Sequence, residues 1–150
     1  MQRFRRSPGR ADVRAWAASP LLGGELELKA DASELTAARR FAEEAGERFG
    51  LEERERYEVT FAVNEAVSNA IEHGRASHEG TIRLRVTDED RALVFYVEDH
   101  GVFKPKAPAV DPFPERGRGL AFMAAMVDEV DVRSGEHGTI VRLCKQRPST

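Results

Sequence analysis

The chain contains very little cysteine and no long apolar run. Cys144 is the one cysteine among 150 residues, so an intramolecular disulfide is excluded. The sequence has no CxxC pair and no paired Cys/His spacing of the kind that holds structural zinc. No apolar stretch approaches the ~20 residues that a membrane-spanning helix needs. These absences exclude a disulfide scaffold and argue against a zinc-stabilised fold and an integral membrane protein.

An excess of charge of one sign is also missing. With 23 Lys and Arg against 26 Asp and Glu, the formal net charge is −3. That balance disfavours a protein that binds nucleic acid through bulk positive charge. The length and a hydrophobic fraction of 41% are sufficient for one domain with one core. We therefore expect a single globular domain with no direct nucleic-acid partner and no membrane association.

The N-terminal segment is basic, and its adjacent residues Arg5 and Arg6 raise the question of an export signal. The apolar stretch that should follow is too short, because residues 16–22 are interrupted by Ser19 and Pro20. We therefore predict a cytoplasmic protein in which residues 1–22 form a flexible basic tail, residues 23–146 form the domain and residues 147–150 form a short C-terminal tail. A nucleic-acid-binding arm is the alternative interpretation of the arginines.

Hydrophobic periodicity predicts both strands and helices along the chain. Alternating or continuous apolar runs predict strands, and apolar residues at i, i+3 and i+4 spacing predict helices. The predicted strands cover residues 25–30, 81–86, 92–97, a stretch around 130–132, and 138–143. The predicted helices follow Ser33 as N-cap and end before Gly50, then cover 52–73 and 120–127. Residues 101–119 carry four prolines and three glycines without periodicity, which is typical of a lid, a binding loop or a disordered segment.

This order of elements predicts an α+β fold. We expect a two-layer α/β sandwich with the helices on one face of a mixed, mostly antiparallel sheet. A cleft between the helical layer and the sheet is the natural place for a ligand.

The second predicted helix carries a polar edge beside its apolar stripe. The stripe consists of Val59, Ala62, Val63, Ala66, Val67 and Ala70. Glu65, Asn69 and Glu72 lie within about 60° of one another on a helical wheel, so they project together at the rim of the core. The carboxylate of Glu65 and the carboxamide of Asn69, four residues apart, suit a hard cation such as Mg²⁺, with Asn69 as its ligand and Glu65 as a base. A solvated polar helix face is the alternative that spacing alone leaves open.

Three further segments could contribute to a site. Asp99 ends an apolar strand before Gly101, where a carboxylate could accept a hydrogen bond from an exocyclic amine, although an ordinary turn is the alternative. Residues 115–122 form a glycine-rich turn that leads into a helix. The N–H groups at the N-terminus of that helix and the two arginines beside them are suited to binding phosphates. The alternative is that the glycines only interrupt regular structure. Thr139 begins the last strand and could support the site or simply belong to a hairpin.

Taken together, these segments resemble the GHKL (Bergerat-fold) ATPases, and more closely the bacterial anti-sigma factor serine/threonine kinases. The resemblance covers about residues 24–145 and is carried by an N box, a G1 box with Asp and Gly, a G2 glycine turn and a late Gly-Thr. Its most specific part is the N box Glu65-Ala-Val-Ser-Asn-Ala-Ile-Glu-His-Gly74, followed by Met126-Val-Asp-Glu-Val130 after the G2 helix.

The resemblance implies a role for each matching position. It implies that Asn69 is the magnesium ligand, Glu65 the general base for the acceptor hydroxyl, and Asp99 the acceptor for the adenine amine. The remaining nucleotide-binding residues that it implies are His73, Gly101 as the close-approach glycine, Arg116, Gly117, Arg118, Gly119, Leu120 and Thr139 as the hydroxyl near Asp99. Phosphoryl transfer needs alignment and charge neutralisation more than covalent help, so this set is chemically coherent.

The resemblance also implies cofactors and partners. In that family ATP is bound with Mg²⁺, and the γ-phosphate goes to a serine or threonine of an anti-anti-sigma (STAS-type) protein. The kinase also sequesters a sigma factor, usually as a homodimer. Arg39 or Arg40, on the first predicted helix, matches the region where such proteins meet their partners.

The G1 box departs from the family pattern. The family commonly has Asp-x-Gly-x-Gly, whereas this chain has Asp99-His-Gly-Val-Phe103 and lacks the second glycine. A catalytically weak or inactive ATP-binding module that regulates a partner by sequestration is therefore an alternative hypothesis. A small metal hydrolase that uses the histidines at 73, 78, 100 and 137 is a third, which no ligand-pair spacing supports.

Overall fold

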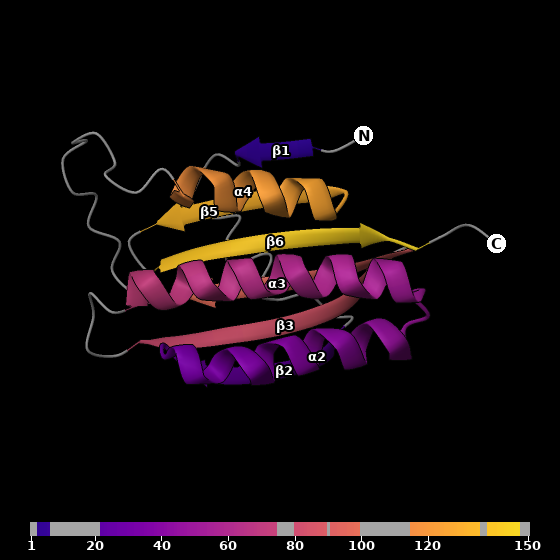
Figure 1. The fold of residues 1–150 in the computed structure, drawn as a ribbon, viewed down its shortest axis with the longest axis horizontal. Coiled ribbons are helices and arrows are strands. Elements are labelled where there is room, and N and C mark those ends of the chain that lie inside the picture. Colours follow the sequence, from indigo (N-terminus) through magenta and orange to yellow (C-terminus); the bar gives the residue numbers. More distant parts are fainter. Residues whose placement is uncertain are drawn as a thin grey trace.

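The computed structural model describes residues 3–6, 22–74, 80–89, 91–99, 115–135 and 138–147. These residues form two layers, with three helices lying on one face of a six-stranded sheet (Figure 1). The α+β sandwich predicted from the sequence is therefore confirmed.

The sheet is antiparallel except at one edge, and its strand order is β1-β5-β6-β4-β3-β2. The parallel pair is β1 with β5. The strands are β1 Arg3–Arg6, β2 Leu22–Lys29, β3 Thr81–Glu89, β4 Ala92–Asp99, β5 Glu129–Gly135 and β6 Gly138–Gln146. The helices are the 3-10 turn η1 Ala32–Glu34, α2 Leu35–Arg48, α3 Glu53–Gly74 and α4 Glu115–Met126.

Three predictions were wrong, each for a local reason: the residue that caps the first helix, the start of α4 and the assignment of residues 3–6 to a tail. The Asp31 side chain, not Ser33, caps the first turn, since its Oδ1 accepts from the Ser33 N–H at 3.0 Å. Helix α4 begins at Glu115, five residues earlier than its apolar periodicity indicates, because glycines are tolerated in a first turn. Residues 3–6 belong to the sheet as β1, whereas they were expected to lie in a tail. An edge strand pairs through its backbone, so this short segment needs no apolar alternation.

The main core lies between the helices and one face of the sheet. All six stripe residues of α3 are buried there, as predicted, against alternate residues of the central strands such as Ile82, Leu84 and Phe95. The ring of Phe95 meets Phe41 of α2 edge-on at 6.4 Å between centroids. Burial of this stripe, at roughly 25 cal/mol per Å² of apolar surface, fixes which side of α3 faces the sheet.

Helices α2 and α3 pack closely at Gly46. A Cβ built on Gly46 would lie 2.9 Å from Cγ of Arg56, which is inside van der Waals contact. The Arg56 guanidinium donates to the Leu51 carbonyl at 2.7 Å and lies 3.5 Å from Glu43. Arg56 therefore covers the glycine and ties the connection between α2 and α3 to both helices.

Helix α4 is held against α3 and the sheet through its C-terminal half. The rings of Phe61 on α3 and Phe122 on α4 meet edge-on, with centroids 6.4 Å apart. Lys145 of β6 donates to the Met126 carbonyl at 2.9 Å and lies 3.6 Å from Glu58 of α3. Met123 is fully buried in the main core. These contacts fix the position of α4 along the length of α3.

Candidate functional site

The polar edge of α3 faces α4. Phe61, Glu65 and Asn69 follow one another at four-residue spacing, so they lie on one side of the helix. Since Phe61 contacts Phe122, this is the side turned toward α4. Glu65 and Asn69 are half-buried, whereas Glu72 is exposed.

The beginning of α4 lies beside the C-terminal half of α3. The two helices run in opposite directions, and the start of α4 lies at the same end of the molecule as the end of α3 (the left end in Figure 1). Asn69 is eight residues beyond Phe61, and Glu115 is seven residues before Phe122. At ~1.5 Å per residue these steps are about 12 Å and about 10 Å, so Asn69 lies nearly level with the first turn of α4.

Asp99 and Thr139 lie side by side on the sheet at this same end. They are register partners where β4 ends and β6 begins. Register partners on one face of an antiparallel pair have Cβ atoms only ~5 Å apart. Asp99 alternates with Phe95 and Val97, which belong to the main core, so its side chain lies on the face that the helices cover. Its exposed fraction is only 3%.

A hydroxyl that the sequence did not single out extends this row. Ser134 of β5 is the register partner of Thr139 on the other side, and the two hydroxyl oxygens are 3.2 Å apart. Asp99, Thr139 and Ser134 therefore form a polar row across three strands, beneath the helical layer. Only the strand order brings Ser134 into this row, so neither periodicity nor a motif could have indicated it.

The G2 glycines lie inside α4 and not in a turn before it. Gly117 and Gly119 belong to the first turns of the helix, which corrects the expected turn. The N–H groups of a helix's first turn have no acceptor within the helix, so an anion can still bind there. Leu120 is half-buried and packs against the main core.

The remaining predicted site residues belong to the G1 box, the end of α3 and the start of α4. Gly101 and the rest of the G1 box beyond Asp99 lie outside the described residues. His73 lies in the last turn of α3, and Arg116 and Arg118 lie in the first turns of α4.

The two arginines proposed to meet partners lie exposed on α2. Arg39 donates to Asn64 Oδ1 at 3.0 Å and to the Thr36 hydroxyl at 3.2 Å. Asn64 immediately precedes Glu65, so the surface of α2 is linked directly to the polar edge of α3. The spacing of residues 39 and 64 in sequence carries no signal for this contact.

Within the described ranges, no group of three or more His, Cys, Asp or Glu side chains could hold a metal ion. His78, His100 and His137, which the hypothesis of a histidine-based metal hydrolase invokes together with His73, lie outside those ranges. The described helices include none that is long and apolar enough to cross a membrane.

The chain matches a known domain family over most of its length and named proteins over more than half of it. A family model described as a histidine kinase-like ATPase domain matches residues 28–145. An anti-sigma F factor of Bacillus subtilis is 34% identical over 98 residues, which cover 59% of this chain and 67% of the relative. A serine-protein kinase RsbW of Bacillus pumilus is 30% identical over 108 residues, covering 62% of this chain and 67% of the relative.

Other relatives are matched over a smaller share of their length. An anti-sigma F factor of Clostridium kluyveri is 30% identical over 85 residues, and the match spans 60% of that protein and 51% of this chain. A crystal structure of the RsbU and RsbW domains of Rv1364c from Mycobacterium tuberculosis superposes with a TM-score of 0.62 at 22% identity. The superposition covers 84% of this chain and 34% of that one, and it supports the fold.

Proposed function

The chain belongs to the histidine kinase-like ATPase domain family, and from this premise we propose that it binds ATP with Mg²⁺ and phosphorylates a serine or threonine of a partner protein. The observation that carries the proposal is that the adjacent residues Asp99 and Thr139 on the sheet lie at the same end of the molecule as Asn69 on α3. These residues come from three distant parts of the sequence. A buried carboxylate, a hydroxyl and a carboxamide are the groups that a purine and a metal-bound triphosphate require.

Asp99 is suited to reading the base. A carboxylate that is 3% exposed can accept a hydrogen bond from an exocyclic amine without competition from bulk water. Thr139 lies beside it and would support the same edge of the ring. The pair would therefore distinguish a base that presents an amine from one that presents a carbonyl oxygen.

Asn69 and the start of α4 are suited to the phosphates. The Asn69 carboxamide oxygen would hold Mg²⁺, which neutralises charge on the phosphate oxygens when bound. The N–H groups of the first turn of α4, together with Arg116 and Arg118, would orient the terminal phosphate. Gly117 and Gly119 would let the phosphate oxygens approach the backbone closely.

Glu65 is suited to the acceptor hydroxyl. It lies one helical turn before Asn69 on the same side of α3, so it would face a hydroxyl brought up to the terminal phosphate. Its part would be to orient that hydroxyl and to take its proton at a carboxylate oxygen.

The names of the similar proteins indicate which partner proteins this chain would bind. Proteins called anti-sigma F factor and serine-protein kinase RsbW are 30–34% identical to this chain. We infer that the protein acts in the cytoplasm as a homodimer, sequesters a sigma factor and phosphorylates an anti-anti-sigma protein. Arg39 and Arg40 would contribute to the partner surface, and the Arg39–Asn64 hydrogen bond would connect that surface to the N box.

Calorimetry of ATP binding, with and without Mg²⁺, tests the nucleotide site. Asp99→Asn should weaken ATP binding roughly tenfold to a hundredfold, the value of one hydrogen bond to a charged group. Glu98→Gln is the matched control, because Glu98 is the neighbouring acid on β4 and points to the opposite face of the sheet. Unchanged affinity in Asp99→Asn would refute the assignment of the base.

Transfer of radiolabel from ATP to candidate STAS-type partners tests the kinase activity. Glu65→Gln should abolish transfer while ATP binding is retained. Tight binding without transfer to any candidate would instead support the sequestering module, in which the altered G1 box has removed catalysis.

A further inference from the structure

The hydroxyls of Ser134 and Thr139 form a pair on the face of the sheet that the helices cover. Alternate residues along β5 and β6 pack in or against the main core, and Ser134 and Thr139 continue these two rows. The two residues are register partners where β5 ends and β6 begins, and their hydroxyl oxygens are 3.2 Å apart. On its other side, Thr139 is the register partner of Asp99. Thr139 therefore lies between a second hydroxyl and the carboxylate assigned to the adenine amine.

The hydrogen bond between two hydroxyls can run in either direction. Each hydroxyl carries one proton and two lone pairs, and the proton rotates to suit its neighbours. If Thr139 donates to Ser134, it presents only lone pairs to a ligand. If Ser134 donates, the Thr139 proton remains available to a third group. The direction of this one hydrogen bond therefore decides whether Thr139 offers a ligand a donor or an acceptor.

The charge of the Asp99 carboxylate favours donation from Ser134 to Thr139. An ionised carboxylate is an acceptor only, and its negative charge attracts the positive end of a nearby O–H dipole. Register partners on one face have Cβ atoms only ~5 Å apart, so the Thr139 hydroxyl lies within this field. Ser134 lies one strand farther away, at a strand spacing of ~4.8 Å, and experiences a weaker field. Hydrogen bonds that run in one direction also strengthen one another.

We propose that Ser134 is a positioning residue that directs the Thr139 hydroxyl proton toward N1 of adenine, the ring nitrogen next to the amine that Asp99 accepts. This inference rests on the proposed function, and it adds a specificity-determining residue to the nucleotide site. Adenine presents an N–H donor at its amine and a lone pair at N1, whereas guanine and hypoxanthine present a carbonyl oxygen and an N–H there. An acceptor at Asp99 beside a donor at Thr139 matches adenine and opposes the other two bases.

The distance between the two hydroxyls sets the size of the effect. Hydroxyl pairs are most often about 2.7–2.8 Å apart, so a contact of 3.2 Å orients a proton and adds little affinity of its own. The hydrogen bond from Thr139 to N1 should be worth about fivefold in affinity, as one neutral hydrogen bond is, and Ser134 governs part of that factor. Because Ser134 is exposed, its replacement by alanine should leave the fold intact.

Calorimetry with ATP and with 1-deaza-ATP, in which a C–H group replaces N1, measures this contact. The wild type should bind 1-deaza-ATP about fivefold more weakly than ATP. In Ser134→Ala the Thr139 proton is no longer directed, so the ratio of the two affinities should fall to about twofold. Ser134→Thr keeps a hydroxyl at the same position and should restore the ratio. The affinity of 7-deaza-ATP relative to ATP should be the same in all of these proteins, because its altered atom lies on the other side of the amine.

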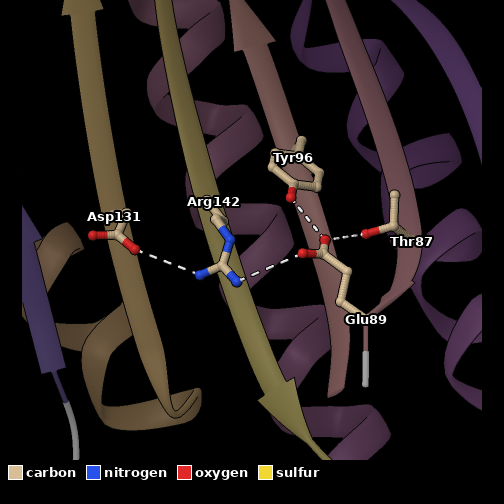
Figure 2. Close-up of polar contacts among 5 residues, drawn as sticks. All are labelled: Thr87, Glu89, Tyr96, Asp131 and Arg142. Carbon is tan, nitrogen blue, oxygen red and sulfur yellow. Dashed lines mark hydrogen bonds and ion pairs between the residues drawn. The ribbon is translucent and has the colours of Figure 1, made fainter. Parts of the chain in front are cut away.

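Tyr96→Phe is the matched control for the loss of a hydroxyl. The Tyr96 hydroxyl donates to Glu89 at 2.7 Å (Figure 2). Tyr96 alternates with main-core residues along β4, so this bond lies on the face of the sheet turned away from the helices. Tyr96→Phe should therefore leave the ratio for 1-deaza-ATP as it is in the wild type.

Three outcomes would overturn the proposal. An equal ratio in Ser134→Ala and in the wild type, with ATP still bound, would remove Ser134 from the site and leave the proposed function standing. A fall in the ratio that is as large in Tyr96→Phe as in Ser134→Ala would trace the effect to a general loss of packing. Failure of the wild type to bind ATP would refute the proposed function, and this inference with it.

Discussion

Replacing Gly46 by alanine tests the close packing of α2 on α3. On helix propensity alone, this change inside α2 should stabilise the fold by up to about 1 kcal/mol. The new methyl group would meet Cγ of Arg56 at 2.9 Å, where carbon atoms prefer 3.5–4.0 Å. The contact is with the stem of the arginine and not with its flexible end, so the whole side chain must shift.

The shift weakens both polar contacts of Arg56. A hydrogen bond from a charged donor contributes about 1.5–3 kcal/mol, and the partly exposed pair with Glu43 adds at most about 1 kcal/mol. Together the two contacts are worth about 1.5–4 kcal/mol, so subtracting the gain in propensity of up to about 1 kcal/mol leaves a net loss of about 0.5–3 kcal/mol. For a domain of this size the melting temperature should fall by roughly 1–12 °C.

The assay is urea and thermal denaturation of four proteins: wild type, Gly46→Ala, Arg56→Ala and the double variant. In the Arg56→Ala background the methyl group meets no obstacle, so Gly46→Ala should there raise stability by up to about 1 kcal/mol. If Gly46→Ala stabilises the wild type as much as it stabilises Arg56→Ala, the steric reasoning is refuted.

Three further substitutions test other contacts. Thr139→Val should weaken ATP binding about fivefold by calorimetry, the value of one hydrogen bond near 1 kcal/mol; unchanged affinity would remove Thr139 from the site. Lys145→Met should lower the free energy of unfolding in urea by about 1–3 kcal/mol, because its bond to the Met126 carbonyl is lost; no loss would contradict its anchoring role. Burial raises the pKa of the Cys144 thiol from 9.0 to about 11, against the opposing charge of Arg142. The folded state therefore retains a proton that the unfolded state releases, so stability should fall as pH rises from 9 to 11. Cys144→Ala should flatten that fall, and an unchanged slope would contradict this origin.

Local patterns in the sequence predicted the parts of the fold that depend on neighbouring residues. The apolar stripe of α3 is buried as its spacing indicates, and the strands predicted over residues 81–86 and 92–97 pair as the β3–β4 hairpin, in which β3 extends to Glu89. The position of Asp99 at the end of a strand followed in the same way. The fold class followed from the order of elements, because an amphipathic helix must cover a sheet face.

Features that depend on distant pairing could not be derived from local patterns. The pairing of Asp99 with Thr139 arises because β6 lies next to β4, and proximity of these two residues was expected from the family resemblance alone. The burial of Tyr96 and Cys144, on the face of the sheet turned away from the helices, has one local signal, since β4 is apolar at nearly every position and not at alternate ones. Such a run is typical of a strand that is covered on both sides.

Helix α4 is attached to the rest of the protein at several described residues. Leu120 packs against the main core, Phe122 meets Phe61, Met123 is fully buried and the Met126 carbonyl accepts from Lys145. These attachments run from the middle of the helix to its last residue. A change of packing at any of them would displace the first turn as well, since a hydrogen-bonded helix moves as one rigid element.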